Sequence, residues 1–84
     1  MENKKNEEKN ESKEEINKNG NLTFEGEYLN GEKNGKVKEY DDNGFIIFEG
    51  EYSIGRRLNG NFKKFDVHGK LLLEHEYKNG KVIK

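Results

Sequence analysis

The sequence predicts an all-β fold, an antiparallel meander of stacked β-hairpin repeats that forms a single twisted sheet. Three observations lead to this prediction. Asn-Gly pairs recur along the chain, and they are typical of tight hairpin turns because both residues tolerate positive φ. Between these pairs, apolar and polar residues alternate over runs of strand length, which is the pattern of a half-buried strand. From residue 19 onward the same run also returns at a nearly constant spacing, which indicates a repeat architecture.

The repeated run is a pentapeptide flanked by glycines. Phe-Glu-Gly-Glu-Tyr at residues 24–28 recurs at 48–52, and the related Leu-Glu-His-Glu-Tyr stands at 73–77. The offsets are 24 and 25 residues, and the third copy stops about halfway through. We therefore divide the repeat domain, residues 19–84, into three copies at about 19–42, 43–67 and 68–84.

Each repeat is expected to form one hairpin, which gives five or six strands in all. Leu22, Phe24, Gly26 and Tyr28 share one face of the first long strand, and the later copies repeat this pattern. The shorter run that follows, residues 36–41, carries Val37 and Tyr40 at a spacing that does not fit strict alternation. A bulge, or a strand with apolar groups on both faces, explains that spacing.

The first 18 residues differ in composition from the rest. They hold six Glu, five Lys and four Asn, and their two apolar residues are Met1 and Ile16. Such a segment buries too little apolar surface to offset its ordering entropy. We expect residues 1–18 to be a disordered, charged tail, with a docking arm that folds on a partner as the alternative.

Charges alternate between the expected strands. Glutamates fall on the long strands, whereas lysines fall on the short strands between them: Glu25, Glu27, Glu49, Glu51, Glu74 and Glu76 against Lys36, Lys38, Lys63 and Lys64. Opposite charges on neighbouring strands stabilise a sheet by about 0.2–1 kcal/mol per pair. An acid/base pair of carboxylates is the alternative, but the intervening lysine strand separates the glutamate rows by about 10 Å. We expect a solvated, salt-bridged face.

Composition excludes several classes of function. The chain has no Cys, two His and a net charge of −1, so we expect no metal site, no cofactor and no nucleic-acid partner. The sequence shows no nucleophilic triad and no phosphate-binding loop, so we expect no enzyme activity and no small-molecule substrate. Since the start is not apolar enough for a secretory signal and no run is long enough to span a membrane, we expect a cytoplasmic protein.

The repeat resembles the MORN repeat. The resemblance rests on the run from Phe24 to Gly35, with its two aromatic residues and closing glycines, followed by Tyr40 and Gly44. It covers residues 19–84, although Leu73 and His75 depart from the motif in the third copy. It implies an elongated antiparallel sheet that serves as a scaffold for protein–protein contacts. The Glu-Gly-Glu-Tyr variant is also similar to bacterial antitoxin-like repeats, which implies a partner toxin.

Two groups of side chains are candidates for binding. The first is the aromatic set, for which the sheet's own packing is the alternative: Phe24, Tyr28, Tyr40, Phe48, Tyr52, Phe65 and Tyr77. We expect Tyr40 to lie over Gly26 or Gly50, and Phe65 to lie over Gly50 or near His75, because a strand glycine leaves room for a neighbouring ring.

The second candidate group is the basic loop with Arg56 and Arg57, which could contact a phospholipid headgroup. The sequence therefore predicts a non-enzymatic protein-interaction module, with a peripheral phospholipid-binding module or an antitoxin-like protein as alternatives. A single sheet leaves an apolar face uncovered, whereas domains normally have two layers. We therefore expect self-association or a protein partner to stabilise the chain.

Overall fold

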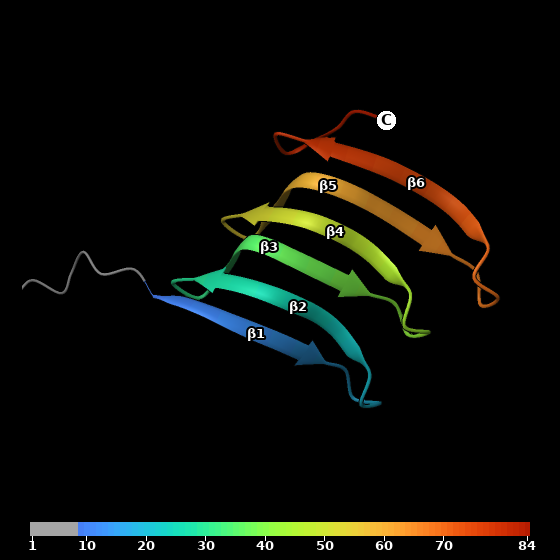
Figure 1. Ribbon diagram of the computed structural model, residues 1–84, viewed down its shortest axis with the longest axis horizontal. Helices are drawn as coiled ribbons and strands as arrows, with labels where there is room; N and C mark the ends of the chain where they lie inside the picture. Colours follow the sequence, from blue (N-terminus) through green and yellow to red (C-terminus); the bar gives the residue numbers. More distant parts are fainter. Residues whose placement is uncertain (1–8) are drawn as a thin grey trace, which may run out of the picture.

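The computed structural model describes residues 9–84, which form one antiparallel sheet (Figure 1). The all-β prediction is confirmed. The sheet has seven strands where five or six were expected: β1 (Asn10–Ile16), β2 (Leu22–Leu29), β3 (Glu32–Tyr40), β4 (Ile46–Ser53), β5 (Arg56–Phe65), β6 (Leu71–Lys78) and β7 (Lys81–Val82).

The strands lie side by side in chain order, from β1 at one edge to β6 and the two-residue β7 at the other (Figure 1). Every neighbouring pair is antiparallel, as in a meander. The shortest principal extent is 13 Å, so the molecule is a single curved layer. Its small core therefore lies on one side of the sheet, without a second layer above it.

One set of hairpin turns is closed by a repeated side-chain hydrogen-bond pattern. In the β3–β4 turn, the Asp41 carboxylate accepts hydrogen bonds from the backbone N–H groups of Asn43 and Phe45, at 2.9 and 3.0 Å. Asp66 does the same in the β5–β6 turn, and Asn17 does so between β1 and β2. A short side chain that accepts from the backbone in this way stabilises a turn locally. The turn before β2 therefore belongs to the same series as the later two.

The spacing of Val37 and Tyr40 is explained by the second expected alternative, a strand with apolar groups on both faces. The register of β3 against β4 shifts between Glu39 and Tyr40. Val37 lies opposite Gly26 and Gly50 and is buried. Tyr40 instead reaches the side chain of Glu25. A spacing of three residues puts them on opposite faces of a regular strand, and the extra residue of the bulge is Ile47 in β4.

The predicted disordered tail is wrong for its second half. Residues 10–16 form β1, which pairs with β2 along its whole length. This segment buries little apolar surface, but β1 is held by ladder hydrogen bonds and by polar side chains such as Glu15, which accepts a hydrogen bond from Tyr28. The part of the prediction that falls on residues 1–8 lies outside the described residues.

Candidate functional site

Five aromatic rings form a continuous ladder across the sheet. The order is Tyr28, Phe24, Tyr52, Phe48 and Tyr77, with ring centroids 5.8, 6.3, 5.9 and 6.0 Å apart in turn. Successive rings meet nearly at right angles, which is a favourable edge-to-face arrangement for aromatic pairs. We call the side of the sheet that carries these five rings the ring face.

Three cations lie over the ladder, and one of them is Lys13, 4.6 Å from the ring centroid of Tyr28. The Lys33 ammonium lies 4.3 Å from the ring centroid of Phe24 and 5.6 Å from that of Tyr52, and the Arg57 guanidinium lies 4.9 Å from that of Phe48. Lys33 is the register partner of Tyr28, and Arg57 is that of Tyr52, so these two cations occupy equivalent places in successive repeats. The aliphatic parts of their long side chains pack against the rings. They cover the rings where a two-layer domain would have a second layer.

Carboxylates bind the tyrosine hydroxyls at two equivalent positions. Tyr28 donates to Glu15, and Tyr52 donates to Glu39 at 3.0 Å. Glu39 also forms an ion pair with Arg57 at 2.8 Å. The hydrogen bond to Glu15 raises the pKa of Tyr28 to about 12, while burial, together with the negative charge of Glu39, raises the pKa of Tyr52 to about 12. Both hydroxyls therefore stay protonated and hold neighbouring strands together.

Three of the predicted binding residues are buried within the ladder. Phe24 and Phe48 are 1% and 0% exposed, and Tyr52 is 9% exposed. These rings are buried by the sheet's own packing, which was the alternative interpretation of the aromatic set. They offer no surface to a partner, whereas Tyr28 and Tyr77 at the ends of the ladder are half-buried.

Tyr40 and Phe65 lie away from the ladder. The Tyr40 hydroxyl donates to Glu25, and this hydrogen bond raises the pKa of Tyr40 to about 12. The Phe65 ring lies 5.3 Å from that of Phe45. The expectation that these two rings cover strand glycines is wrong. Each ring lies three residues after an apolar residue of the ring face, Val37 or Phe62, so regular alternation puts it on the opposite face.

The space beside the strand glycines is filled in another way. A Cβ atom on Gly26 would lie 2.7 Å from a methyl carbon of Val37. One on Gly60 would lie 2.5 Å from the carbonyl oxygen of Glu49 and 3.0 Å from the ring of Phe48. The glycines therefore permit close approach of neighbouring strands, as expected, but a valine and backbone atoms take the room that was expected for Tyr40.

The two arginines of the basic loop are separated by the fold. Arg57 faces the ring ladder and is paired with Glu39, whereas Arg56 is exposed. Adjacent strand residues point to opposite faces, so the sequence neighbours do not act as one basic patch. Of the predicted pair, Arg56 alone remains available to an anionic partner.

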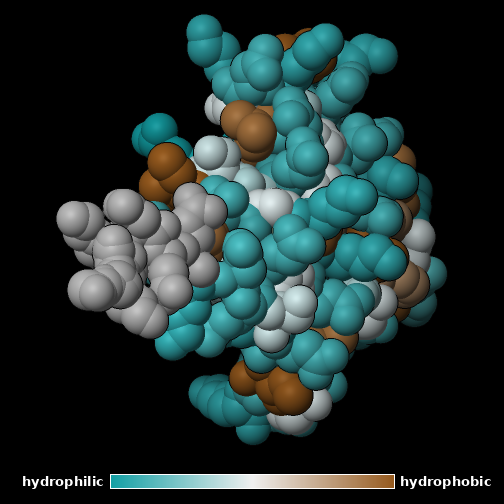
Figure 2. Space-filling view, turned by 60° about the vertical axis from the view of Figure 1, so that its left-hand side comes forward, coloured by the Kyte–Doolittle hydropathy of each residue, from teal (hydrophilic) through white to brown (hydrophobic). Residues whose placement is uncertain are grey.

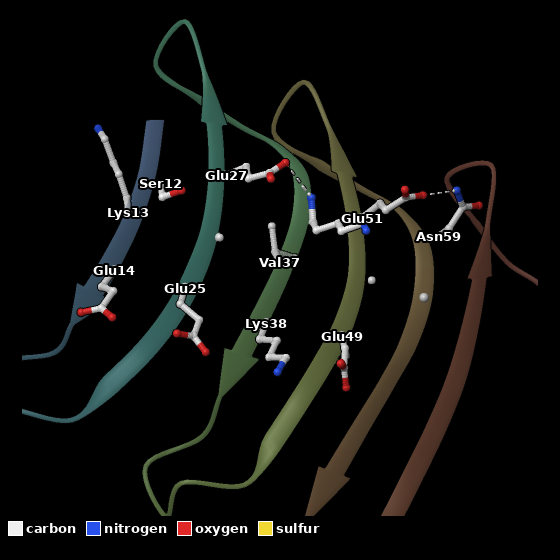
Figure 3. Close-up of a pocket in the computed structure, with 14 residues that line it drawn as sticks. Ser12, Lys13, Glu14, Glu25, Glu27, Val37, Lys38, Glu49, Glu51 and Asn59 are labelled. Atoms are coloured by element: carbon white, nitrogen blue, oxygen red, sulfur yellow. Dashed lines mark hydrogen bonds between the residues drawn. The ribbon is translucent and has the colours of Figure 1, made fainter. Parts of the chain in front are cut away.

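The other side of the sheet is hollowed. Its walls carry Glu25, Glu27, Lys36, Lys38, Glu49 and Glu51, and we call this side the charged face (Figure 3). The hollow has a volume of about 1030 Å³ and spans β1 to β5. A cross-strand row of residues crosses the middle of the hollow: Gly26, Val37, Gly50 and Gly60. The side chain of Val37 points to the ring face, and the other three residues have no side chain. Backbone therefore forms the floor, and charged side chains form the walls.

The predicted alternation of charge on this face is confirmed by the register. Lys38 lies opposite both Glu25 and Glu49, and Lys36 lies opposite Glu51. Among residues 9–84, however, no ion pair within 4.0 Å joins these rows. The pairs at that distance lie on the ring face: Lys13–Glu11, Lys33–Glu15 and Arg57–Glu39. The salt-bridged face is therefore the one with the rings, and the charged face presents aligned but separate charges.

Sequence reasoning missed the contributions of β1 and of the polar groups beneath the rings. A signal was present, because Glu15 and Asn17 precede Glu39 and Asp41 by the repeat offset of 24 residues. The segment before residue 19 is thus the second half of an earlier repeat. Its apolar positions are replaced by charged residues such as Lys13, which lies at the position of Val37.

Neither a metal centre nor a membrane-spanning helix is found in residues 9–84. These residues contain no cluster of three or more His, Asp or Glu side chains suited to a metal ion. They also contain no helix long and apolar enough to cross a membrane. Comparisons with protein-family models, curated proteins and solved structures gave no match.

Proposed function

We propose that this chain is a non-enzymatic, MORN-like protein-interaction module that receives a partner protein in the hollow of its charged face. The observation that carries the proposal is that the two faces of the sheet differ in how their side chains are paired. The ring face uses its aromatic rings and ion pairs internally. The charged face holds a hollow of about 1030 Å³ whose Glu and Lys rows are not joined by close ion pairs among the described residues.

Glu25, Glu27 and Glu51 each accept a hydrogen bond within the sheet, but no lysine ammonium of the described residues lies within 4.0 Å of their carboxylates. Aligned charges that are not paired with each other suit a partner segment that carries both signs. Charge complementarity of this kind steers association and fixes register. The floor adds partly buried backbone between the charged walls. A partner toxin is one protein that this proposal covers. The side of the molecule seen in Figure 2 is largely hydrophilic, with hydrophobic side chains gathered in a few separate patches.

Enzyme chemistry has little support from the same side chains. Glu25 and Glu49 are separated by the strand that carries Lys38, so their carboxylates flank a lysine and do not form a close acid/base pair. Glu25 also accepts the hydrogen bond of Tyr40. The arrangement is suited to ionic recognition across several strands.

The test begins with photo-crosslinking in cells from a probe at Glu49, with a probe at the exposed Ile54 as the control site. The captured protein is identified, purified and titrated against the full chain. Glu49→Lys/Glu51→Lys is expected to weaken binding at least tenfold, because it reverses two wall charges. Arg56→Glu, which lies outside the hollow, is the matched charge control and is expected to change binding less than twofold.

Two results would contradict the proposal. A partner whose affinity is unchanged by Glu49→Lys/Glu51→Lys does not use the hollow. Co-sedimentation of the chain with anionic phospholipid vesicles, lost on Arg56→Glu but retained by the hollow variant, would favour the phospholipid alternative.

A further inference from the structure

Exposed apolar side chains gather at the C-terminal edge of the sheet. Leu71, Leu72 and Leu73, at the start of β6, are 45%, 56% and 42% exposed. Val82 and Ile83 beside the same strand are about half exposed. An exposed leucine run on an edge strand is the kind of surface that templates further strand pairing.

The outer edge of β6 is paired over part of its length. β7 covers Tyr77 and Lys78, and Glu76 exchanges backbone hydrogen bonds with Ile83 and Lys84. In the described part of the chain no strand lies beyond residues 71–75. The equivalent strands β2 and β4 are paired along this stretch from Phe24 and Phe48 onward. The repeat architecture therefore leaves one strand position open beside β6.

The sequence at this edge is complementary to itself. It reads Lys70-Leu71-Leu72-Leu73-Glu74, so an antiparallel copy with its two-fold axis at Leu72 places three leucine pairs between two Lys–Glu pairs. Leu72 also has no register partner on β5, since Leu71 pairs with Phe65 and Leu73 pairs with Lys64.

We propose that β6 pairs edge to edge with β6 of a second copy of this chain. Leu72 lies on the two-fold axis, Leu71 lies opposite Leu73 of the second copy, and Lys70 lies opposite its Glu74. This pairing joins the two sheets into one and covers the leucines of both chains. It deepens the proposed function, on whose interaction role it rests, by naming one partner, and it uses a surface separate from the hollow.

A head-to-tail arrangement, with β1 of the next copy beside β6, fits less well. Within the chain, Glu25 of β2 lies opposite Lys38 of β3. The equivalent residues are Glu74 in β6 and Glu14 in β1, so head-to-tail pairing would place two glutamates opposite each other. Like charges directly opposite are destabilising. The isologous arrangement also closes after two copies.

Cross-linking tests the register directly, because the chain contains no cysteine. Cβ atoms of directly opposite residues lie about 4.5–5.5 Å apart, close to the span of a disulfide. In the full chain under mild oxidation, Leu72→Cys is expected to give a covalent dimer. Ile54→Cys, at an exposed position in the β4–β5 turn, is expected to remain mainly monomeric.

A charge swap tests the flanking pairs by sedimentation equilibrium. The unmodified chain is expected at twice its 9.8 kDa mass. Lys70→Glu and Glu74→Lys each bring like charges together and are expected to weaken dimerisation at least tenfold. The double variant Lys70→Glu/Glu74→Lys restores opposite charges and is expected to recover most of the affinity. Far-UV circular dichroism of the single variants should match that of the unmodified chain, which shows that they are folded.

Three outcomes overturn the inference. They are a monomer throughout the micromolar range, a dimer that survives Leu72→Lys, and equal cross-linking at Leu72→Cys and Ile54→Cys. Each is independent of partner binding in the hollow, because Lys70, Leu72 and Glu74 do not line it. A failed dimer with a partner that still depends on Glu49 would refute this inference and leave the proposed function standing.

Discussion

Replacing Gly50 with alanine is expected to be among the most damaging single-methyl changes in this sheet. A Cβ atom on Gly50 would lie 2.1 Å from the carbonyl oxygen of Asn59 and 2.6 Å from the Cα atom of Gly60. Both are backbone atoms, so no side-chain rotation relieves the contact. β4 and β5 must separate by about 1 Å to reach ordinary van der Waals distance.

The cost follows from that displacement. Overpacking a well-packed site costs about 1–3 kcal/mol, and we expect about 3 kcal/mol for Gly50→Ala because the ladder hydrogen bonds of two central strands are strained with it. A domain of this length has a free energy of unfolding of about 4–13 kcal/mol. A loss of that size should lower the Tm by more than 10 °C.

Urea unfolding followed by far-UV circular dichroism measures the loss at a fixed protein concentration, at which any self-association is held constant. Gly20→Ala is the matched control, because its Cβ atom meets nothing within 4 Å while its φ of +86° is unfavourable for alanine. That variant isolates the conformational cost, about 1 kcal/mol. If Gly50→Ala loses no more stability than Gly20→Ala, the close approach of β4 and β5 is not a constraint on this fold.

Three further predictions concern the hydrogen bonds of the sheet. Glu39→Gln removes the charge that faces a half-buried arginine and should cost about 1–3 kcal/mol in urea unfolding; an unchanged midpoint would contradict a structural role for that ion pair. Because the pKa values of Tyr28, Tyr40 and Tyr52 are raised from 10.0 to about 12, their stabilising contribution is complete below pH 10 and is lost between pH 10 and 12. Absorbance titration at 295 nm should show these three ionising late, together with unfolding, and ionisation near pH 10 would refute the assigned bonds. Asp41→Ala removes the acceptor of two turn N–H groups and should cost about 1 kcal/mol by thermal melting, whereas a neutral effect would show that the turn closes without it.

The meander was predictable because its signals are local. Asn-Gly turns and period-2 alternation act within a few residues, and the repeat of residues 24–28 at 48–52 made the pattern visible twice. The positive φ values of Asn30 and Gly31 are of the kind that these turn residues favour. The acid and base rows were predictable for the same reason, since adjacent strands of a meander are paired by short turns.

The composition of the candidate site was less predictable because it depends on register. The irregularity in β2–β3 pairing between Gly26 and Tyr28 places Lys33, and not Gly35, opposite Tyr28. No local pattern of the sequence announces that shift. Tyr40 was expected above a glycine, but its odd spacing from Val37 puts it on the charged face beside Glu25.

The two edges of the sheet are chemically unequal, and this inequality follows from the repeat itself. β3 and β5 each supply one cation to the ring ladder, at Lys33 and Arg57, and at the corresponding register position β7 supplies Val82 beside Tyr77. At the other edge, β1 completes the pattern, because Glu15 bonds to Tyr28.

The N-terminal edge thus ends in a charged, polar strand that completes its neighbour, whereas the C-terminal edge ends in leucines beside a strand position that the repeat pattern would fill. Lysine and glutamate on an edge strand discourage further pairing, and an apolar edge invites it. A module built in this way should associate through β6 and keep β1 as a solvated border. Because the hollow of the charged face spans β1 to β5 and excludes β6, dimerisation through β6 leaves both hollows open to partner proteins.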